Sequence, residues 1–187
     1  MRVGVLVFDG VEELDFVGPW EVLSYANKLR PGSLQMYLVG THSPIQAFNK
    51  LRVLPDVTLA DCPQLDILVL PGGKGRLREM KNPDILQFIR QQYPGLSWLT
   101  SVCTGAFFLA EARLLQGRRA TTHFSAIEEL AGYPGIDVQR ERVVQDGKIL
   151  CAAGVASGLD LGLYLLETLF GNDLADQVAT NIEYRRT

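Results

Sequence analysis

The sequence is poor in the residues that build metal sites and disulfide frameworks. Of 187 residues, three are cysteine and two are histidine. An odd number of cysteines lying far apart predicts free thiols, and no histidine–cysteine cluster has ligand spacing, so we expect neither a metal nor a cofactor. No apolar run is long enough to cross a bilayer, and the start of the chain lacks the basic region, apolar core and cleavage site of a secretory signal. We therefore expect a cytoplasmic protein without a membrane partner.

The charge balance also excludes classes of partner. A net charge of −3 gives no reason to expect nucleic acid or an anionic membrane surface. With 47% hydrophobic and 21% charged residues, the chain is rich enough in apolar side chains for a sizeable core. It contains no repeat, low-complexity tract or linker, so we expect one domain over residues 1–187.

Strand-like and helix-like segments alternate along the chain. We expect strands at 3–8, 34–39, 65–70, 97–102 and 119–123, hairpins at 45–54 and 142–152, and helices at 19–27, from 82, from about 104 to 115, at 158–170 and at 174–184. This order predicts an α/β three-layer sandwich, with a mostly parallel sheet covered by helices on both faces. The functional crevice of such a sheet lies at the carboxyl ends of its strands.

The most informative residue is Cys103. It ends an apolar strand-like segment and precedes Thr104-Gly105, which opens a helix. This pattern predicts a nucleophile elbow, a sharp strand-to-helix turn that presents one reactive side chain. A helix N-terminus favours negative charge, so we expect a lowered thiol pKa and a thiolate nucleophile. A buried structural cysteine is the other interpretation; we prefer it for Cys151 and regard Cys62 as a bystander.

Carboxylates and glycines near other strand ends are further candidates. Asp15 lies among apolar neighbours, which would raise its pKa toward the range useful for acid catalysis, but a helix cap is an equal interpretation. For Glu12 and Glu13 we prefer a solvated acidic loop together with a helix cap. Gly72 and Gly73 follow an apolar strand, and their N–H groups are candidate oxyanion donors, although Pro-Gly-Gly is often only a turn.

The remaining polar candidates are histidines and a basic stretch. A cysteine–histidine dyad has one candidate partner, His123, at the end of the segment 119–123, whereas His42 lies in a polar loop. Residues 74–78 are more basic than a small neutral substrate requires.

These features together resemble the ThiJ/PfpI superfamily, the class I glutamine-amidotransferase-like proteins, over nearly the whole chain. The segments that carry the resemblance are 5–10, 12–15, 69–73, 101–106, 117–123 and 153–160. Within the superfamily, Asp15, the Cys103-Thr104 pair and the segment 181–184 look most like the isocyanide hydratases. The chain also resembles the ligand-sensing half of AraC-type regulators. The resemblance implies a flavodoxin-like sandwich and a homodimer.

The resemblance further implies hydration of an isocyanide through a Cys103 thioimidate. Asp15 would supply a proton and orient water, and Thr104 and Gly73 would position the reacting groups. An apolar pocket would be bordered by Phe16, Trp20 and Phe107. Two alternatives stay open. One is glyoxalase, deglycase or amidase-like chemistry on a carbonyl, with His123 or Asp15 moving protons; the other is a small-molecule or redox sensor without catalysis.

Overall fold

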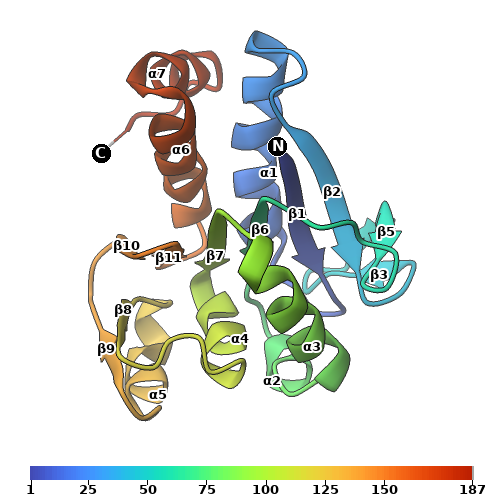
Figure 1. The fold of residues 1–187 in the computed structure, drawn as a ribbon, viewed down its shortest axis with the longest axis vertical. Helices are drawn as coiled ribbons and strands as arrows, with labels where there is room; N and C mark the ends of the chain where they lie inside the picture. Colours follow the sequence, from blue (N-terminus) through green and yellow to red (C-terminus); the bar gives the residue numbers. More distant parts are fainter. Residues whose placement is uncertain (187) are drawn as a thin grey trace.

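A seven-stranded sheet forms the centre of the computed structural model, which describes residues 1–186 (Figure 1). The strands of the chain are β1 (Arg2–Val7), β2 (Gln35–Gly40), β3 (Ile45–Gln46), β4 (Arg52–Val53), β5 (Val57–Thr58), β6 (Ile67–Leu70), β7 (Trp98–Val102), β8 (Arg118–Ala120), β9 (Ile136–Val138), β10 (Val143–Asp146) and β11 (Ile149–Ala152). The order in the large sheet is β10-β11-β7-β6-β1-β2-β5. Its neighbours pair in parallel except β10 and β11, which form an antiparallel hairpin.

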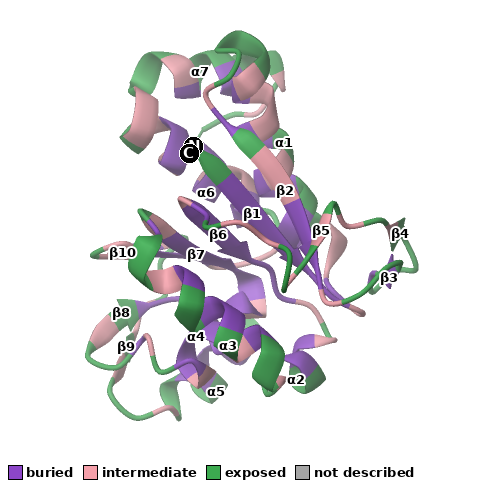
Figure 2. Ribbon diagram, turned by 45° about the vertical axis from the view of Figure 1, so that its right-hand side comes forward, coloured by how far each residue is buried: buried purple, intermediate pink, exposed green. Residues whose placement is uncertain are grey.

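Helices cover both faces of this sheet, which confirms the predicted fold class. They are α1 (Glu13–Leu29), α2 (Arg76–Glu79), α3 (Pro83–Gln92), α4 (Ala106–Glu111), α5 (Ile127–Ala131), α6 (Ser157–Phe170) and α7 (Asn172–Asn181). Helices α1, α6 and α7 pack together on one side, and α3 and α4 lie on the other (Figures 1 and 2). The central strands are therefore buried on both faces, as Figure 2 shows, and this explains their nearly continuous apolar sequences.

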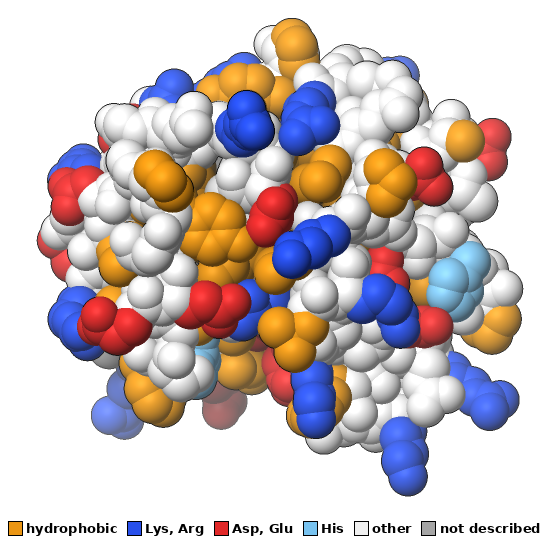
Figure 3. Space-filling model, turned by 90° about the horizontal axis from the view of Figure 1, so that it is seen from below, with side chains coloured by type: hydrophobic (Ala, Val, Ile, Leu, Met, Phe, Trp, Pro, Cys, Tyr) orange, Lys and Arg blue, Asp and Glu red, His pale blue; other side chains and the backbone are white. Residues whose placement is uncertain are grey.

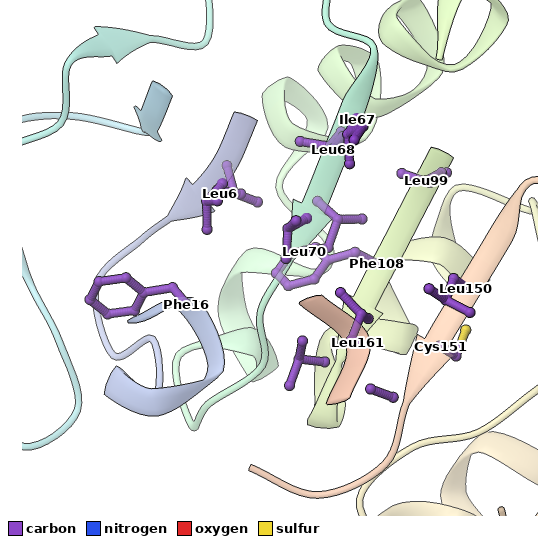
Figure 4. Packing of buried hydrophobic residues seen from close by; sticks show 14 of the residues in the cluster. Leu6, Phe16, Ile67, Leu68, Leu70, Leu99, Phe108, Leu150, Cys151 and Leu161 are labelled. Atoms are coloured by element: carbon purple, nitrogen blue, oxygen red, sulfur yellow. The ribbon is translucent and has the colours of Figure 1, made fainter. Parts of the chain in front are cut away.

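The core runs between the sheet and both helical layers. Figure 4 shows buried side chains of this core from several elements: Leu70 of β6, Phe108 of α4, Leu150 of β11 and Phe16 of α1. Cys151 is also fully buried in it, as expected for a structural thiol.

Several local predictions are confirmed. Segments β3 and β4 pair as the predicted short hairpin, and β10 and β11 as the second. Asn82 caps α3 by accepting a hydrogen bond from the Asp84 N–H at 3.0 Å.

Three boundaries differ from the predictions. Helix α1 begins at Glu13 and not at Pro19, so Pro19 lies inside it. Glycines explain why this proline fits: Gly18 and Gly158 let α1 and α6 approach closely, and a Cβ on Gly158 would lie 2.9 Å from Pro19 Cδ. Helix α4 ends at Glu111. The segment predicted as a strand at 119–123 contains only β8, which pairs with β9 in a separate sheet.

Candidate active site

Cys103 lies at the sharp turn that the sequence predicts. Strand β7 ends at Val102, and Cys103 begins a single 3-10 turn that leads into α4. Its φ of 57° lies in the left-handed region, which is costly for a residue with a side chain and typical of a functional elbow. The Thr122 hydroxyl donates to the Cys103 carbonyl at 2.9 Å and holds the turn. A Cβ on Gly105 would collide with the Leu70 carbonyl, so this position requires glycine.

Asp15 is brought to this elbow by the first turn of α1. The residue is fully buried, and the Gly72 N–H donates to its Oδ2 at 2.9 Å. Its Oδ1 is buried without a hydrogen-bond partner of normal geometry among residues 1–186. The Cys103 thiol is a neighbour of this carboxyl and contributes to its pKa. The carboxyl that carries this oxygen therefore neighbours the candidate nucleophile.

Burial dominates the protonation of this pair. It raises the pKa of Asp15 to about 7, against the opposing effect of the Gly72 N–H. Burial and then the charge of Asp15 raise the pKa of Cys103 to about 12. The expectation of a lowered thiol pKa was thus wrong, because the favourable hydrogen bonds from Thr104 are weaker than the loss of solvent. At neutral pH the resting pair is a thiol beside a partly ionised carboxyl.

The two glycines after β6 organise the site through their backbone. A Cβ on Gly72 would lie 2.5 Å from the Thr104 nitrogen, so the loop approaches the elbow more closely than any other residue allows. The Gly72 N–H is held by Asp15, and the Gly73 N–H donates to Thr104 Oγ1 at 3.1 Å. Both donors are already used. The predicted oxyanion donors therefore act here as clamps on Asp15 and Thr104.

A cavity of about 320 Å³ opens onto the elbow. Four of the residues singled out in the sequence line it, namely Gly73, Cys103, Thr104 and His123. His123 lies at the cavity with its Nδ1 2.8 Å from Ser125 Oγ and its ring against Phe124. The carboxyl ends of the strands thus bring together residues that are far apart in the sequence.

Phe16 and Trp20 are not among the residues that line this cavity. Phe16 is 3% exposed and belongs to the core, and Trp20 is half-buried and packs against it. Both lie on α1, which begins six residues earlier than predicted, and Phe16 belongs to the buried face of this helix. Phe107 is also absent from the lining and is fully buried in the core. The expected aromatic border is therefore absent from the cavity wall in the described chain.

In place of that border, the cavity wall contains charged residues that the sequence analysis did not single out as functional, namely Glu12, Lys74 and Arg76. The lining is completed by the apolar residues Leu77 and Val155. Glu12 is half-buried, and burial followed by the charge of Glu13 raises its pKa. It is the N-cap residue of α1, as the helix-cap interpretation predicts, but its side chain makes no capping hydrogen bond and is not fully solvated. For Glu12, three residues before Asp15, and for Lys74, directly after Gly73, this closeness to candidate residues was the available signal.

Arg76 is held rigidly in the wall. Its guanidinium makes two hydrogen bonds to Glu129, at 2.7 and 2.6 Å, and lies 4.0 Å from the centre of the Phe107 ring. Its charge is therefore compensated within the protein.

Within residues 1–186 there is no group of three or more histidine, cysteine or acidic side chains that is able to hold a metal ion. No helix in that range is long and apolar enough to cross a membrane.

Comparison with known proteins finds relatives over most of the chain. A profile of the DJ-1/PfpI family matches residues 1–168. The chain is 37% identical to an isonitrile hydratase of Pseudomonas putida over 98% of its own length and 78% of the relative's. It is 32% identical to the HTH-type transcriptional regulator CdhR of Pseudomonas aeruginosa, over 93% of this chain and 52% of the regulator.

Solved structures give the same result. The structure of a ThiJ/PfpI family protein from Pseudomonas syringae superposes with a TM-score of 0.90 at 31% identity, over 100% of this chain and 76% of the other. Schizosaccharomyces pombe DJ-1 shares the fold, with a TM-score of 0.84 at 21% identity over 99% of this chain and 100% of that one.

Proposed function

The chain belongs to the DJ-1/PfpI family, and on this premise we propose that it is a cysteine enzyme that hydrates isocyanides to N-substituted formamides. One observation carries the proposal: a fully buried Asp15 carboxyl, with one oxygen lacking a hydrogen-bond partner among residues 1–186, neighbours the Cys103 thiol. The similarity of this chain to an isonitrile hydratase, over most of both chains, supports the choice of substrate.

The first step adds the thiol across the isocyanide carbon of R–N≡C. Ionised Asp15 accepts the proton of the Cys103 thiol as the sulfur approaches the substrate and then delivers it to that carbon. The sulfur–carbon bond forms, one carbon–nitrogen π bond is lost, and the product is the thioimidate R–N=CH–S–Cys103. A carboxyl with a pKa of about 7 is suited to both transfers, since it exchanges protons readily near neutral pH.

The second step releases the product by hydrolysis. Asp15 accepts one proton from water as the water oxygen attacks the thioimidate carbon, and passes this proton to the nitrogen. The carbon–sulfur bond then breaks as the new hydroxyl group becomes the carbonyl, the hydroxyl proton passes through Asp15 to the Cys103 sulfur, and R–NH–CHO departs. Thr104, fixed by the Gly73 N–H, lies on the cavity wall beside the sulfur and positions the reacting groups.

The test measures the conversion of n-butyl isocyanide to its formamide by the wild type and by variants of the two reacting residues. We expect turnover by the wild type and none by Cys103→Ala or Asp15→Asn. A matched control is Cys62→Ala, which removes a half-buried thiol outside the site and should keep full activity. Undiminished activity in Cys103→Ala or Asp15→Asn would refute the mechanism.

Carbonyl chemistry of the glyoxalase or deglycase type is the second candidate, and His123 favours it because the imidazole lines the same cavity as Cys103. Turnover of methylglyoxal without turnover of n-butyl isocyanide, lost in His123→Asn, would replace the first proposal. Sensing without catalysis is the third candidate. It would be supported by selective oxidation of Cys103 under mild peroxide in a protein that turns over neither compound.

We propose in addition that the protein acts in the cytoplasm as a homodimer. Exposed apolar side chains support an interface beside the site: Leu14 and Val17 on α1, and Phe48 and Leu51 around the hairpin. The Phe48 N–H donates to the Val11 carbonyl at 2.8 Å, which keeps these two segments together. Light scattering should give a molecular mass twice that of the chain for the wild type. For Val17→Glu it should give the mass of a single chain.

A further inference from the structure

The loop between β6 and α2 presents a single side chain to the cavity, that of Lys74. Its flanking glycines are clamped: the Gly73 N–H donates to Thr104 Oγ1 at 3.1 Å, and the Gly75 N–H to the Gly10 carbonyl at 2.9 Å. A Cβ on either glycine would collide with the neighbouring backbone. The Cα of Lys74 is therefore fixed at the cavity wall, and only its flexible side chain is free to move.

The charge of Lys74 is uncompensated. Among residues 1–186 it takes part in no ion pair, whereas Arg76, the other cation of the cavity, is paired with Glu129. Figure 3 looks onto the carboxyl-terminal edge of the sheet, where basic, acidic and apolar side chains are interspersed. On this mixed surface, the cavity beside Cys103 contains one cation that is available to a ligand.

No basic side chain is among the groups that shift the pKa values of the reacting pair. The groups that shift the pKa of Cys103 are Asp15 and Thr104, and the charge that shifts the pKa of Asp15 is that of Glu12. Glu12 is therefore the wall charge that acts on the reacting pair, whereas Lys74 lines the same cavity without shifting either pKa. The lining also includes Leu77 and Val155, which are apolar.

We infer that the substrate carries a carboxylate remote from its isocyanide carbon and that Lys74 binds this carboxylate. The inference rests on the proposed isocyanide hydration and names the class of substrate, an isocyano carboxylic acid with a short apolar body. Glu12 gives the orientation, because its negative charge disfavours the substrate carboxylate at the end occupied by Asp15. Lys74 is then a specificity-determining residue and takes no part in bond making.

The experiment compares isocyanoacetate with methyl isocyanoacetate, two molecules of similar size that differ in charge. The wild type should hydrate the acid with a kcat/KM about five- to tenfold above that of the ester, and this preference should shrink as salt is added. Lys74→Met should remove the preference by lowering kcat/KM for the acid alone, and Lys74→Arg should keep it.

Lys81→Met is the matched control, since it removes the same charge from an exposed lysine outside the cavity. It should leave the ratio of the kcat/KM values for the two substrates unchanged. The inference would be overturned if Lys81→Met and Lys74→Met lowered kcat/KM for isocyanoacetate equally. It would also be overturned if Lys74→Met left the ratio of kcat/KM for the acid to kcat/KM for the ester unchanged. Hydration of n-butyl isocyanide without preference for isocyanoacetate overturns it too and leaves the proposed function intact. If the wild type hydrates none of the three isocyanides, both fall together.

Discussion

Replacing Asp15 by asparagine should abolish the activity and at the same time stabilise the fold. The amide keeps an oxygen that accepts the Gly72 N–H, which now donates to Oδ2 at 2.9 Å, while it removes the charge and places an NH2 group in the position of the other oxygen. A carboxyl that is fully buried, with one oxygen unpartnered among the described residues, is costly to ionise. The native protein accepts this cost because the proposed chemistry requires the carboxylate.

The magnitude follows from the pKa. Burial raises it from 3.8 to about 7, so the folded state holds the proton more tightly than the unfolded state. Ionisation therefore lowers the free energy of unfolding as pH rises from about 4, and this loss is complete above about 7. It amounts to about 4 kcal/mol at about pH 8, of which about 3 kcal/mol develops between about pH 5 and that value.

Urea unfolding of both proteins, followed by tryptophan fluorescence at about pH 5 and about pH 8, measures this difference. The advantage of Asp15→Asn should grow with pH by about 3 kcal/mol. Glu21→Gln is the matched control, because it removes the charge of an exposed carboxyl on the same helix and should give no such growth. An advantage that stays constant with pH, or a variant less stable than the wild type at about pH 8, would refute the burial argument.

Three further predictions concern the same region. Because the first step needs ionised Asp15, kcat/KM for n-butyl isocyanide should rise with pH and level off above about 7, and a flat profile would contradict this role. Cys103→Gly should be more stable than Cys103→Ala by about 1 kcal/mol in urea unfolding, since glycine relieves the φ of 57°; equal stabilities would show that the turn is unstrained. Glu129→Gln weakens the partner of buried Arg76 and should lower the free energy of unfolding by about 2 kcal/mol. Its neighbour Glu128→Gln, which affects an exposed ion pair, should change it by less than about 0.5 kcal/mol, and similar losses in both variants would contradict the argument.

The sequence alone determined the features that depend on neighbours along the chain. Apolar segments such as 67–70 and 98–102 predict strands buried on both faces, and Cys103 before Thr104-Gly105 predicts the elbow that β7 and α4 form. The motifs also identified the family, which the match over residues 1–168 confirms. Such signals are readable because strand burial and turn geometry are written into a few consecutive residues.

Only the tertiary structure decided which groups meet and in which charge state. Asp15 accepts a hydrogen bond from the N–H of Gly72, 57 positions away in the sequence. Neighbouring residues alone therefore did not distinguish a helix cap from a catalytic residue at Asp15. The packing of α1 buries Phe16 in the core, and the cavity is lined instead by residues such as Glu12 and Lys74. The pKa of Cys103 rose although its place before a helix predicts the opposite, because burial is a property of the whole fold and outweighs the few N–H groups of one turn.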